Sequence, residues 1–300
     1  MESKNNYQIV NFALMERLLD DMKTRACEST IKCNKSLMNQ LRNFLSQYGG
    51  DYQQKAITPE LCDEFEKYLS QRVRQSSCRN YLQRMSALLA DAERRGIIES
   101  NPMQAISRSR LPKKAESDKV YLTKEELEQL RNAECLHENT RNAFLLSCYT
   151  GLSLTDIETL RWENITAIDG QWMIVKKLDK GGNEARVPMV EPTQQLMQKI
   201  KVEYDALPKE LQDGRLFHLY TRTTIFRDLM RWAKRANLKK QLSFIVARHT
   251  FGTLAITAGI DLYTLIKWMG LSGLESARAY ADMLNPQPKD NVEALRAILS

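Results

Sequence analysis

The sequence lacks any apolar run approaching the roughly 18 residues that a membrane-spanning helix needs, and its first six residues lack the apolar stretch of a signal peptide. We therefore expect a cytoplasmic protein with no membrane partner. Only three histidines occur, and none of the six cysteines belongs to a CxxC pair. This scarcity argues against a zinc site and against a disulfide-stapled secreted fold. We expect reduced, mostly buried thiols, no metal and no other cofactor.

The length and charge of the chain favour two domains and an acidic partner. Its 300 residues are about twice the length of a typical single domain. The 44 Lys+Arg residues exceed the 37 Asp+Glu residues by seven. Residues 1–116 carry 19 basic and 14 acidic residues, whereas the remaining 184 carry 25 and 23. The first part is therefore the more basic per residue, as expected of a segment that clamps an acidic molecule.

Helical periodicity dominates the first hundred residues. The clearest pattern runs over residues 76–95, with Ser76 and Ser77 as expected caps and Gly96 behind it. Earlier helices are expected over residues 8–27, 30–48 and 58–69, the last beginning with a Thr-Pro-Glu signature. These segments predict a bundle of about four helices.

A basic segment without apolar periodicity follows. Residues 107–118 carry Arg108, Arg110, Lys113 and Lys114 around a proline, which is typical of an extended linker. The alternative interpretation is a solvated run of charge.

The second half mixes helices with one hairpin signal. Thr123 and Glu126 form an expected capping box, residues 141–149 are apolar enough for a buried helix, and Thr155 to Glu158 form another expected box after a tight loop at 151–154. Residues 172–178 and 185–190 are rich in β-formers and flank the turn residues 179–183, which predicts a hairpin. From residue 223 onward the pattern is helical again.

Four short motifs occur in order in this half. Thr150-Gly151-Leu152 stands at an expected helix start, and Lys180 lies seven residues before Val187-Pro188. Arg248-His249-Thr250-Phe251 comes next, then Met269-Gly270-Leu271, with Tyr280 nine residues after Leu271. With the basic helical first part, this order and spacing resemble the tyrosine recombinase (phage integrase) family over essentially the whole chain.

The resemblance implies an enzyme that breaks DNA by attack of a tyrosine hydroxyl on the scissile phosphate, forming a 3′-phosphotyrosyl link and releasing a 5′-hydroxyl without metal. Family members use two arginines, a hairpin lysine, two histidine-class residues and the tyrosine. The transition state gathers negative charge on the phosphate oxygens, so fixed cations and donors are needed. By this resemblance Tyr280 is the nucleophile, Arg248 the second arginine, and Lys180 the acid for the leaving oxygen.

Three positions depart from the family pattern. Ser153 stands in place of the first arginine, Ile245 in place of the histidine before Arg248, and Leu271 in place of the histidine of the Leu-Gly-His motif. Because Ile and Leu can neither donate a hydrogen bond nor move a proton, we expect an atypical or attenuated site. Partial replacements for the lost arginine are the Ser153 hydroxyl and four nearby cations: Arg161, Lys176, Lys177 and Arg186.

Several of these residues have ordinary interpretations outside this context. Tyr280 would be a tyrosine of an amphipathic helix, and Lys180 a solvated lysine at a turn. We expect His249 to be structural, since it points about 100° away from Arg248 on a helix.

Basic residues on three segments are the expected phosphate contacts. One segment is a helix spanning residues 227–240, whose polar face is nearly all cationic and whose alternative interpretation is a solvated face. The expected DNA-binding residues are Arg79, Arg84, Arg108, Arg110, Lys113, Lys114, Arg227, Arg231, Lys234 and Arg235.

We expect a mainly α protein with a small β-hairpin or sheet, in the two-domain architecture with which the family clamps DNA. Residues 1–106 would form a helical, SAM-like core-binding domain, residues 107–119 a basic linker, and residues 120–300 a mixed α/β catalytic-type domain. One hypothesis is a site-specific recombinase or integrase of a mobile element. The other is a catalytically silent DNA-binding relative with a regulatory or architectural function. A metabolic enzyme is a distant third, because no phosphate loop or metal cluster is visible.

Double-stranded DNA is the expected partner. We also expect the protein to self-associate on DNA as a dimer or tetramer. A DNA-bending helper or an active recombinase is a further candidate partner. Residues 285–300 include a short amphipathic helix. By resemblance it docks onto a neighbouring protomer in a ring of four; the alternative is that it packs on its own domain.

Overall fold

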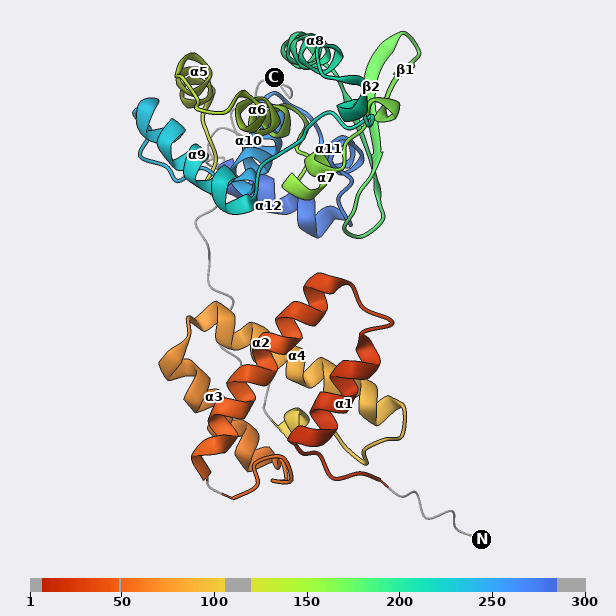
Figure 1. Cartoon of the computed structure of the whole chain (residues 1–300), viewed down its shortest axis with the longest axis vertical. Coiled ribbons are helices and arrows are strands. Elements are labelled where there is room, and N and C mark those ends of the chain that lie inside the picture. Colours follow the sequence, from red (N-terminus) through yellow and green to blue (C-terminus); the bar gives the residue numbers. More distant parts are fainter. Residues whose placement is uncertain (1–6, 49, 106–119, 285–300) are drawn as a thin grey trace, which may run out of the picture. The chain divides into compact units, whose positions relative to one another are not determined.

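The computed structural model describes residues 7–48, 50–105 and 120–284. The chain forms two compact units, Met1–Ser117 and Asp118–Ser300, and each has its own hydrophobic core. Helices dominate both units, and the second contains a three-stranded sheet (Figure 1). These features confirm the expected mainly α fold with a small sheet. The predicted basic linker and the predicted tail helix lie outside the described residues.

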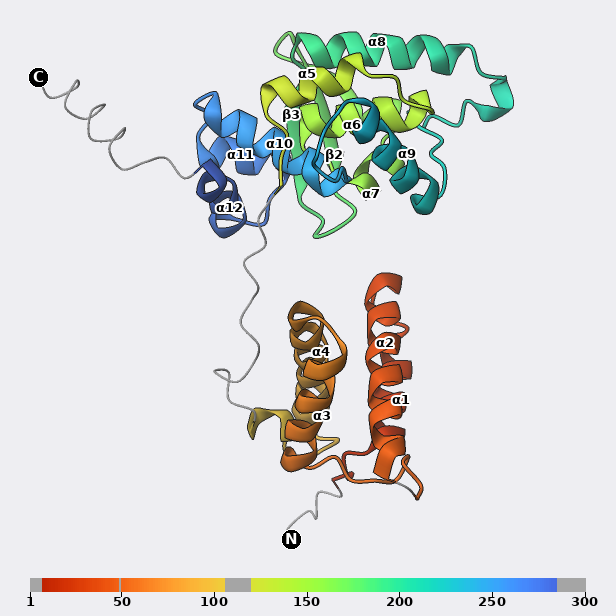
Figure 2. The ribbon, with the colours of Figure 1, turned by 90° about the vertical axis from the view of Figure 1, so that its left-hand side faces the viewer.

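Over residues 7–48 and 50–105, unit 1 is a bundle of four α-helices, as predicted. They are α1 (Phe12–Met22), α2 (Glu28–Leu45), α3 (Pro59–Arg72) and α4 (Gln75–Arg94), with short 3₁₀ turns at Ser46–Tyr48 and Pro102–Ala105. Helix α2 contacts α1, α3 and α4 (Figure 2). The Thr58 side chain accepts the N–H of Leu61 at the start of α3, as its Thr-Pro-Glu signature predicts. The predicted serine caps of the fourth helix are wrong, because α4 begins after Arg74 without a side-chain cap.

Unit 2 combines helices with a sheet that lies at one edge of the unit (Figure 1). Its elements are α5 (Lys124–Asn132), α6 (Glu138–Thr150), α7 (Leu154–Glu158), β1 (Ile165–Ile168), β2 (Gln171–Lys177), β3 (Glu184–Pro188), α8 (Glu191–Asp205), α9 (Arg222–Arg235), α10 (Phe244–Thr257), α11 (Leu262–Met269) and α12 (Leu274–Leu284), with 3₁₀ turns at Trp162–Asn164 and Lys209–Leu211. The predicted capping box of Thr123 and Glu126 is present at α5. Among residues 7–48, 50–105 and 120–284, no helix has both the length and the apolar character needed to cross a membrane.

The sheet is an antiparallel meander in the order β1-β2-β3. The predicted hairpin is confirmed: Ile174 of β2 pairs with Val187 of β3. Strand β1 was not predicted, because four residues with little burial give no clear alternation. Along β2, Ile174 and Lys176 are buried whereas Lys177 is exposed, so the two neighbouring lysines project from opposite faces.

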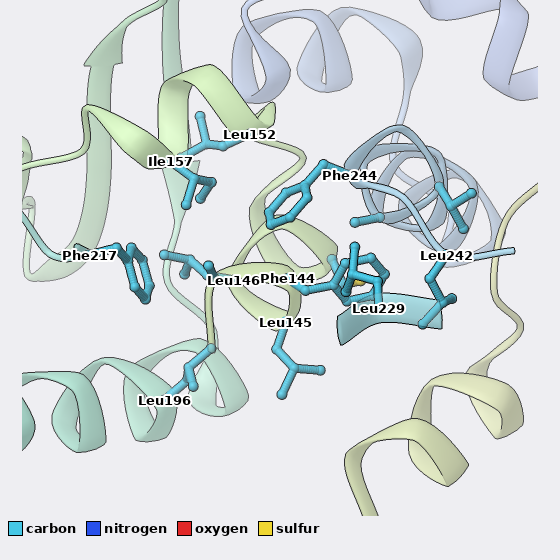
Figure 3. Close-up of a cluster of buried hydrophobic side chains, with 14 of the residues drawn as sticks. Phe144, Leu145, Leu146, Leu152, Ile157, Leu196, Phe217, Leu229, Leu242 and Phe244 are labelled. Atoms are coloured by element: carbon cyan, nitrogen blue, oxygen red, sulfur yellow. The ribbon is translucent and has the colours of Figure 1, made fainter. Parts of the chain in front are cut away.

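Helix α6 runs through the core of unit 2, as its apolar sequence predicts. Figure 3 shows Phe144, Leu145 and Leu146 of α6 among buried side chains from the neighbouring elements. The helix ends at Gly151, whose φ of 70° is left-handed. A Cβ at this position would lie 2.7 Å from a ring carbon of Phe251, so only glycine permits this close approach of α6 to α10.

Two predicted boundaries in unit 2 are wrong. The capping box of α7 consists of Ser153 and Asp156 rather than of Thr155 and Glu158. Helix α9 ends at Arg235 rather than at residue 240, since Asn237 takes a φ of 53° and the chain turns. Beyond this turn the Lys240 ammonium binds the Tyr121 carbonyl at 2.8 Å and the Glu126 carboxylate at 2.6 Å.

Candidate active site

Arg248 lies at the centre of the candidate site. It projects from α10, which begins after Ser243. Its Nη1 donates to the Gly151 carbonyl, and its Nη2 donates to the Met269 carbonyl at 3.1 Å. A guanidinium has five N–H donors, and the other three have no partner among the described residues. Arg248 therefore joins the α6–α7 loop to the end of α11 and retains donors for an anion.

Ser153 has a structural task at the start of α7. Its hydroxyl donates to Asp156 Oδ2 at 2.5 Å, and its backbone N–H donates to the same oxygen at 3.2 Å. The hydroxyl proton is thus committed to a carboxylate. This contact argues against Ser153 as the replacement for a phosphate-binding arginine.

Asp156 also fixes the hairpin turn. The residue is 4% exposed, and its Oδ1 accepts the backbone N–H of Asp179 at 3.0 Å. The Asp179 side chain in turn accepts the Thr159 hydroxyl at 2.5 Å. Residue 180 follows directly, so these bonds restrain the turn that carries Lys180. The Lys180 side chain itself is exposed and has no partner among the described residues.

The other side of the turn rests on the end of α11. The Asn183 amide donates to the Gly270 carbonyl at 3.3 Å. Gly270 has a φ of 58°, and a Cβ there would lie 2.6 Å from Leu178 Cδ1. Leu271, directly after it, is partly buried in an apolar cluster. Ile245, by contrast, is 67% exposed on the first turn of α10.

Tyr280 belongs to α12, and its ring packs in an apolar seat on α10. It is 6% exposed and belongs to a cluster with Ala255, Leu265 and Met269. A Cβ at Gly252 would lie 2.5 Å from Tyr280 Cδ1, so the ring lies directly on the glycine backbone. Among the described contacts, no hydrogen bond joins Tyr280 to Arg248 or Lys180.

Helix α10 places Arg248 and the tyrosine seat on the same side. Residues 248 and 252 are four apart, which puts them on one helix face. His249 Nδ1 donates to the Val120 carbonyl at 3.2 Å, and its ring lies edge-on to Tyr280 with centroids 6.0 Å apart. The structure therefore brings Arg248 and Tyr280 to one helix and sets the turn bearing Lys180 at the end of α11.

The four nearby cations differ in their surroundings. Arg161 donates to the Asp213 carbonyl at 2.6 Å, and Arg186 to Glu184 at 2.5 Å. Lys177 is exposed. Lys176 is buried and lies 3.7 Å from Asp179, within the group of residues that holds the hairpin turn.

The predicted DNA-binding residues fall into three groups. On α4, Arg79 is half-buried, and Arg84 donates to Asn34 at 3.4 Å beside a cavity of about 300 Å³. On α9, Arg235 is paired with Glu134 at 3.6 Å. The exposed α9 residues without a described partner are Arg227, Arg231 and Lys234, and those outside the described residues are Arg108, Arg110, Lys113 and Lys114.

Sequence reasoning missed the contributions of Asp156, Asp179 and Gly252. The Ser-x-x-Asp spacing was an available signal for the first. No local pattern points to the Asp179 contacts or to the seat of Tyr280, because both join segments that are distant in sequence.

Comparison with known proteins gives the class. The phage integrase family matches residues 120–285, and the phage integrase SAM-like domain matches residues 11–109. The chain therefore belongs to the phage integrase family. This membership confirms the resemblance seen in the motifs and supports tyrosine recombinase as the class of function.

Individual relatives agree over nearly the full length. A tyrosine recombinase of Thermosipho africanus is 23% identical over 286 residues, which cover 90% of this chain and 94% of that protein. A lambda integrase (75–356) dimer bound to a COC′ core site matches with a TM-score of 0.69 at 17% identity, covering 93% of this chain and 98% of that one. XerH recombinase bound to palindromic difH substrate in a post-cleavage complex matches with a TM-score of 0.71 at 17% identity, covering 96% of this chain and 85% of that one. At these identities the solved structures establish the shared fold.

Proposed function

We propose that this chain is a site-specific recombinase or integrase of a mobile element that cuts and rejoins double-stranded DNA through Tyr280. The observation that carries the proposal is on α10. Arg248 is held by the Gly151 and Met269 carbonyls with donors left over, and the helix seats Tyr280 at Gly252, one turn further along the same face. A fixed guanidinium on the helix face that also seats a tyrosine suits attack on a phosphodiester.

In the proposed reaction the Tyr280 oxygen bonds to phosphorus as the bond from phosphorus to the 5′-oxygen breaks. Lys180 gives a proton to that oxygen, and Arg248 binds the non-bridging oxygens. Ile245 and Leu271 have no atom that accepts the phenolic proton, so this proton passes to solvent or to a phosphate oxygen. The absence of those two groups is the basis for proposing an attenuated site. The free 5′-hydroxyl of another strand then attacks the phosphotyrosine and restores the tyrosine.

A covalent-adduct assay tests the proposal. Duplexes drawn from the DNA next to the gene are each nicked near a candidate cleavage position. A duplex that carries the recombination site should trap protein joined to DNA, because the short fragment beyond the nick diffuses away and cannot be rejoined. Tyr280→Phe should abolish the adduct and leave DNA binding intact. Persistent binding of the wild-type protein without an adduct on any such duplex would reject the catalytic proposal.

The second candidate is a catalytically silent DNA-binding protein that acts as a regulator or beside an active recombinase. Two observations favour it: Ser153, Ile245 and Leu271 replace groups that the chemistry uses, and Tyr280 is buried. Binding needs only the basic surfaces. Under this candidate, Ser153→Arg, Ile245→His and Leu271→His together should create cleavage where the wild type has none. A triple variant that binds DNA but still does not cleave it would count against a simple loss of these three groups.

We further propose that the protein assembles on DNA as a dimer or tetramer, with Arg227, Arg231 and Lys234 of α9 as phosphate contacts. The lambda integrase and XerH structures are themselves complexes with DNA. In a plot of the logarithm of the binding constant against the logarithm of the salt concentration, removing one phosphate contact should make the slope shallower by about one. Arg231→Ala should show this reduction in fluorescence anisotropy, whereas Arg235→Ala, whose guanidinium is paired with Glu134, should show less of it.

A further inference from the structure

Lys176 is a buried lysine next to the loop where the family's first arginine is missing. Its residue exposure is 6%, and it occupies the face of β2 that also buries Ile174. Burying an ammonium is costly unless an anion and hydrogen-bond acceptors replace its water. The position of Lys176 therefore calls for an oxyanion.

Among the described residues, the Lys176 ammonium has a nearby carboxylate but no hydrogen-bond acceptor. The nearest carboxylate oxygen, Asp179 Oδ2, lies 3.7 Å from Nζ, which is too long for a hydrogen bond. The same oxygen already accepts the Thr159 hydroxyl. Among the described residues Lys176 donates no hydrogen bond, so its three N–H donors stand ready for another oxygen.

A short series of contacts connects this ammonium to position 153. Ser153 donates to Asp156, Asp156 accepts the Asp179 backbone N–H, and the Asp179 carboxylate faces Lys176. Arg248 bonds to Gly151 in the same loop. Residues 151–156 are thus bordered by a cation from α10 and, through two carboxylates, by a cation from β2.

We propose that Lys176 binds the scissile phosphate in place of the arginine that Ser153 replaces, acting together with Arg248; the inference rests on the proposed recombinase function. The ammonium and the guanidinium each contact non-bridging oxygens, and neither exchanges a proton with them. Lys180 remains the proton donor to the leaving oxygen. The charge missing from the α6–α7 loop is supplied from the neighbouring strand.

The competing explanation is that Lys176 only neutralises Asp179. The two explanations predict different second-site changes that rescue the loss of Lys176. If Lys176 binds phosphate, Ser153→Arg should restore activity. If Lys176 only neutralises Asp179, removing that carboxylate with Asp179→Asn should restore activity.

The experiment measures single-turnover formation of the covalent adduct on the nicked duplex. Lys176→Met should slow the reaction on the order of a hundredfold. The control Lys209→Met, at an exposed lysine in the turn Lys209–Leu211, should stay within about threefold because its ammonium is already solvated. Ser153→Arg in the Lys176→Met background should restore at least about tenfold, whereas Asp179→Asn in that background should restore nothing. If methionine impairs folding, as judged by circular dichroism, Lys176→Gln keeps a polar end on a slightly shorter side chain and carries the same expectation.

Two results would overturn the inference: cleavage by Lys176→Met at the wild-type rate, or rescue by Asp179→Asn in place of Ser153→Arg. If the wild type itself forms no adduct, the catalytic proposal fails separately. The inference is then decided by DNA binding, where Lys176→Met should lower the log–log salt slope by about one. An unchanged slope would reject it.

Discussion

Two of the residues discussed for the candidate site differ sharply in solvent exposure. Ile245 stands in solvent on the first turn of α10, and Tyr280 is enclosed by apolar side chains. The motifs were enough to assign Arg248, Lys180 and Tyr280 as candidates. They could not show that Lys176 is buried, because lysine is rarely buried and its burial here depends on how the sheet packs on the unit.

The seat of Tyr280 is testable at one residue. Gly252→Ala would place a methyl group 2.5 Å from the ring, so α12 must shift or the ring must leave. We expect unit 2 to lose about 1–3 kcal/mol of unfolding free energy and Tyr280 to become more accessible. Nitration by tetranitromethane, located by mass spectrometry, measures the second effect. The control is Gly259→Ala, where no atom lies within 4 Å and only the strain of a φ of 87° is added; equal nitration of Tyr280 in both variants would contradict the proposed seat.

At the scale of elements, the sequence predicts helices and the hairpin well and their ends less well. Most helix bodies follow from apolar spacing that local sequence displays. The start of α7 was misplaced because Ser153 to Asp156 and Thr155 to Glu158 share the same spacing and polarity. In the structure Asp156 also accepts the Asp179 N–H, and Glu158 pairs with Arg222; both partners lie far along the chain, so local sequence shows neither contact.

The capping box of α7 gives a second prediction. Asp156→Ala removes the acceptor of the Ser153 hydroxyl and of the Asp179 N–H, so we expect a loss of about 1–3 kcal/mol in unfolding free energy. The Asp179 amide should also exchange faster with deuterium. Glu158→Ala should cost less than about 1 kcal/mol, since the side-chain contact described for Glu158 is an ion pair at the surface with Arg222. The reverse order in urea unfolding would favour the box at 155 and 158.

The start of α2 predicts a reactive thiol. Cys27 is exposed, and hydrogen bonds from the hydroxyls of Ser29 and Thr30 lower its pKa to about 7. Its thiolate fraction should therefore rise through neutral pH, and Cys27 should react with Ellman's reagent before the other thiols. Burial raises the pKa of Cys62 to about 12, so it should react only on unfolding. Ser29→Ala should slow the Cys27 reaction at pH 7; an unchanged rate would exclude the hydroxyl contact as the cause.

At the scale of the whole molecule, each unit encloses its own core. Composition and length indicated two domains, and the helical first hundred residues indicated where one of them lies.

Separate cores predict separate responses to a core mutation. Phe65→Ala removes a buried ring from unit 1 and should cost that unit about 3–5 kcal/mol. In differential scanning calorimetry one transition should move to lower temperature while the other stays in place. Phe144→Ala, in the core of unit 2, should move the other transition. A common shift of all transitions in both variants would show that the two cores unfold as one.

The hold on Arg248 has a practical consequence for engineering. Both of its described partners are main-chain carbonyls, so exchanging a neighbouring side chain removes neither acceptor, provided that Gly151 is retained. A designer who rebuilds the exposed position 245 can therefore keep this anchor, whereas a change at 153 must also replace the cap that the Ser153 hydroxyl forms with Asp156.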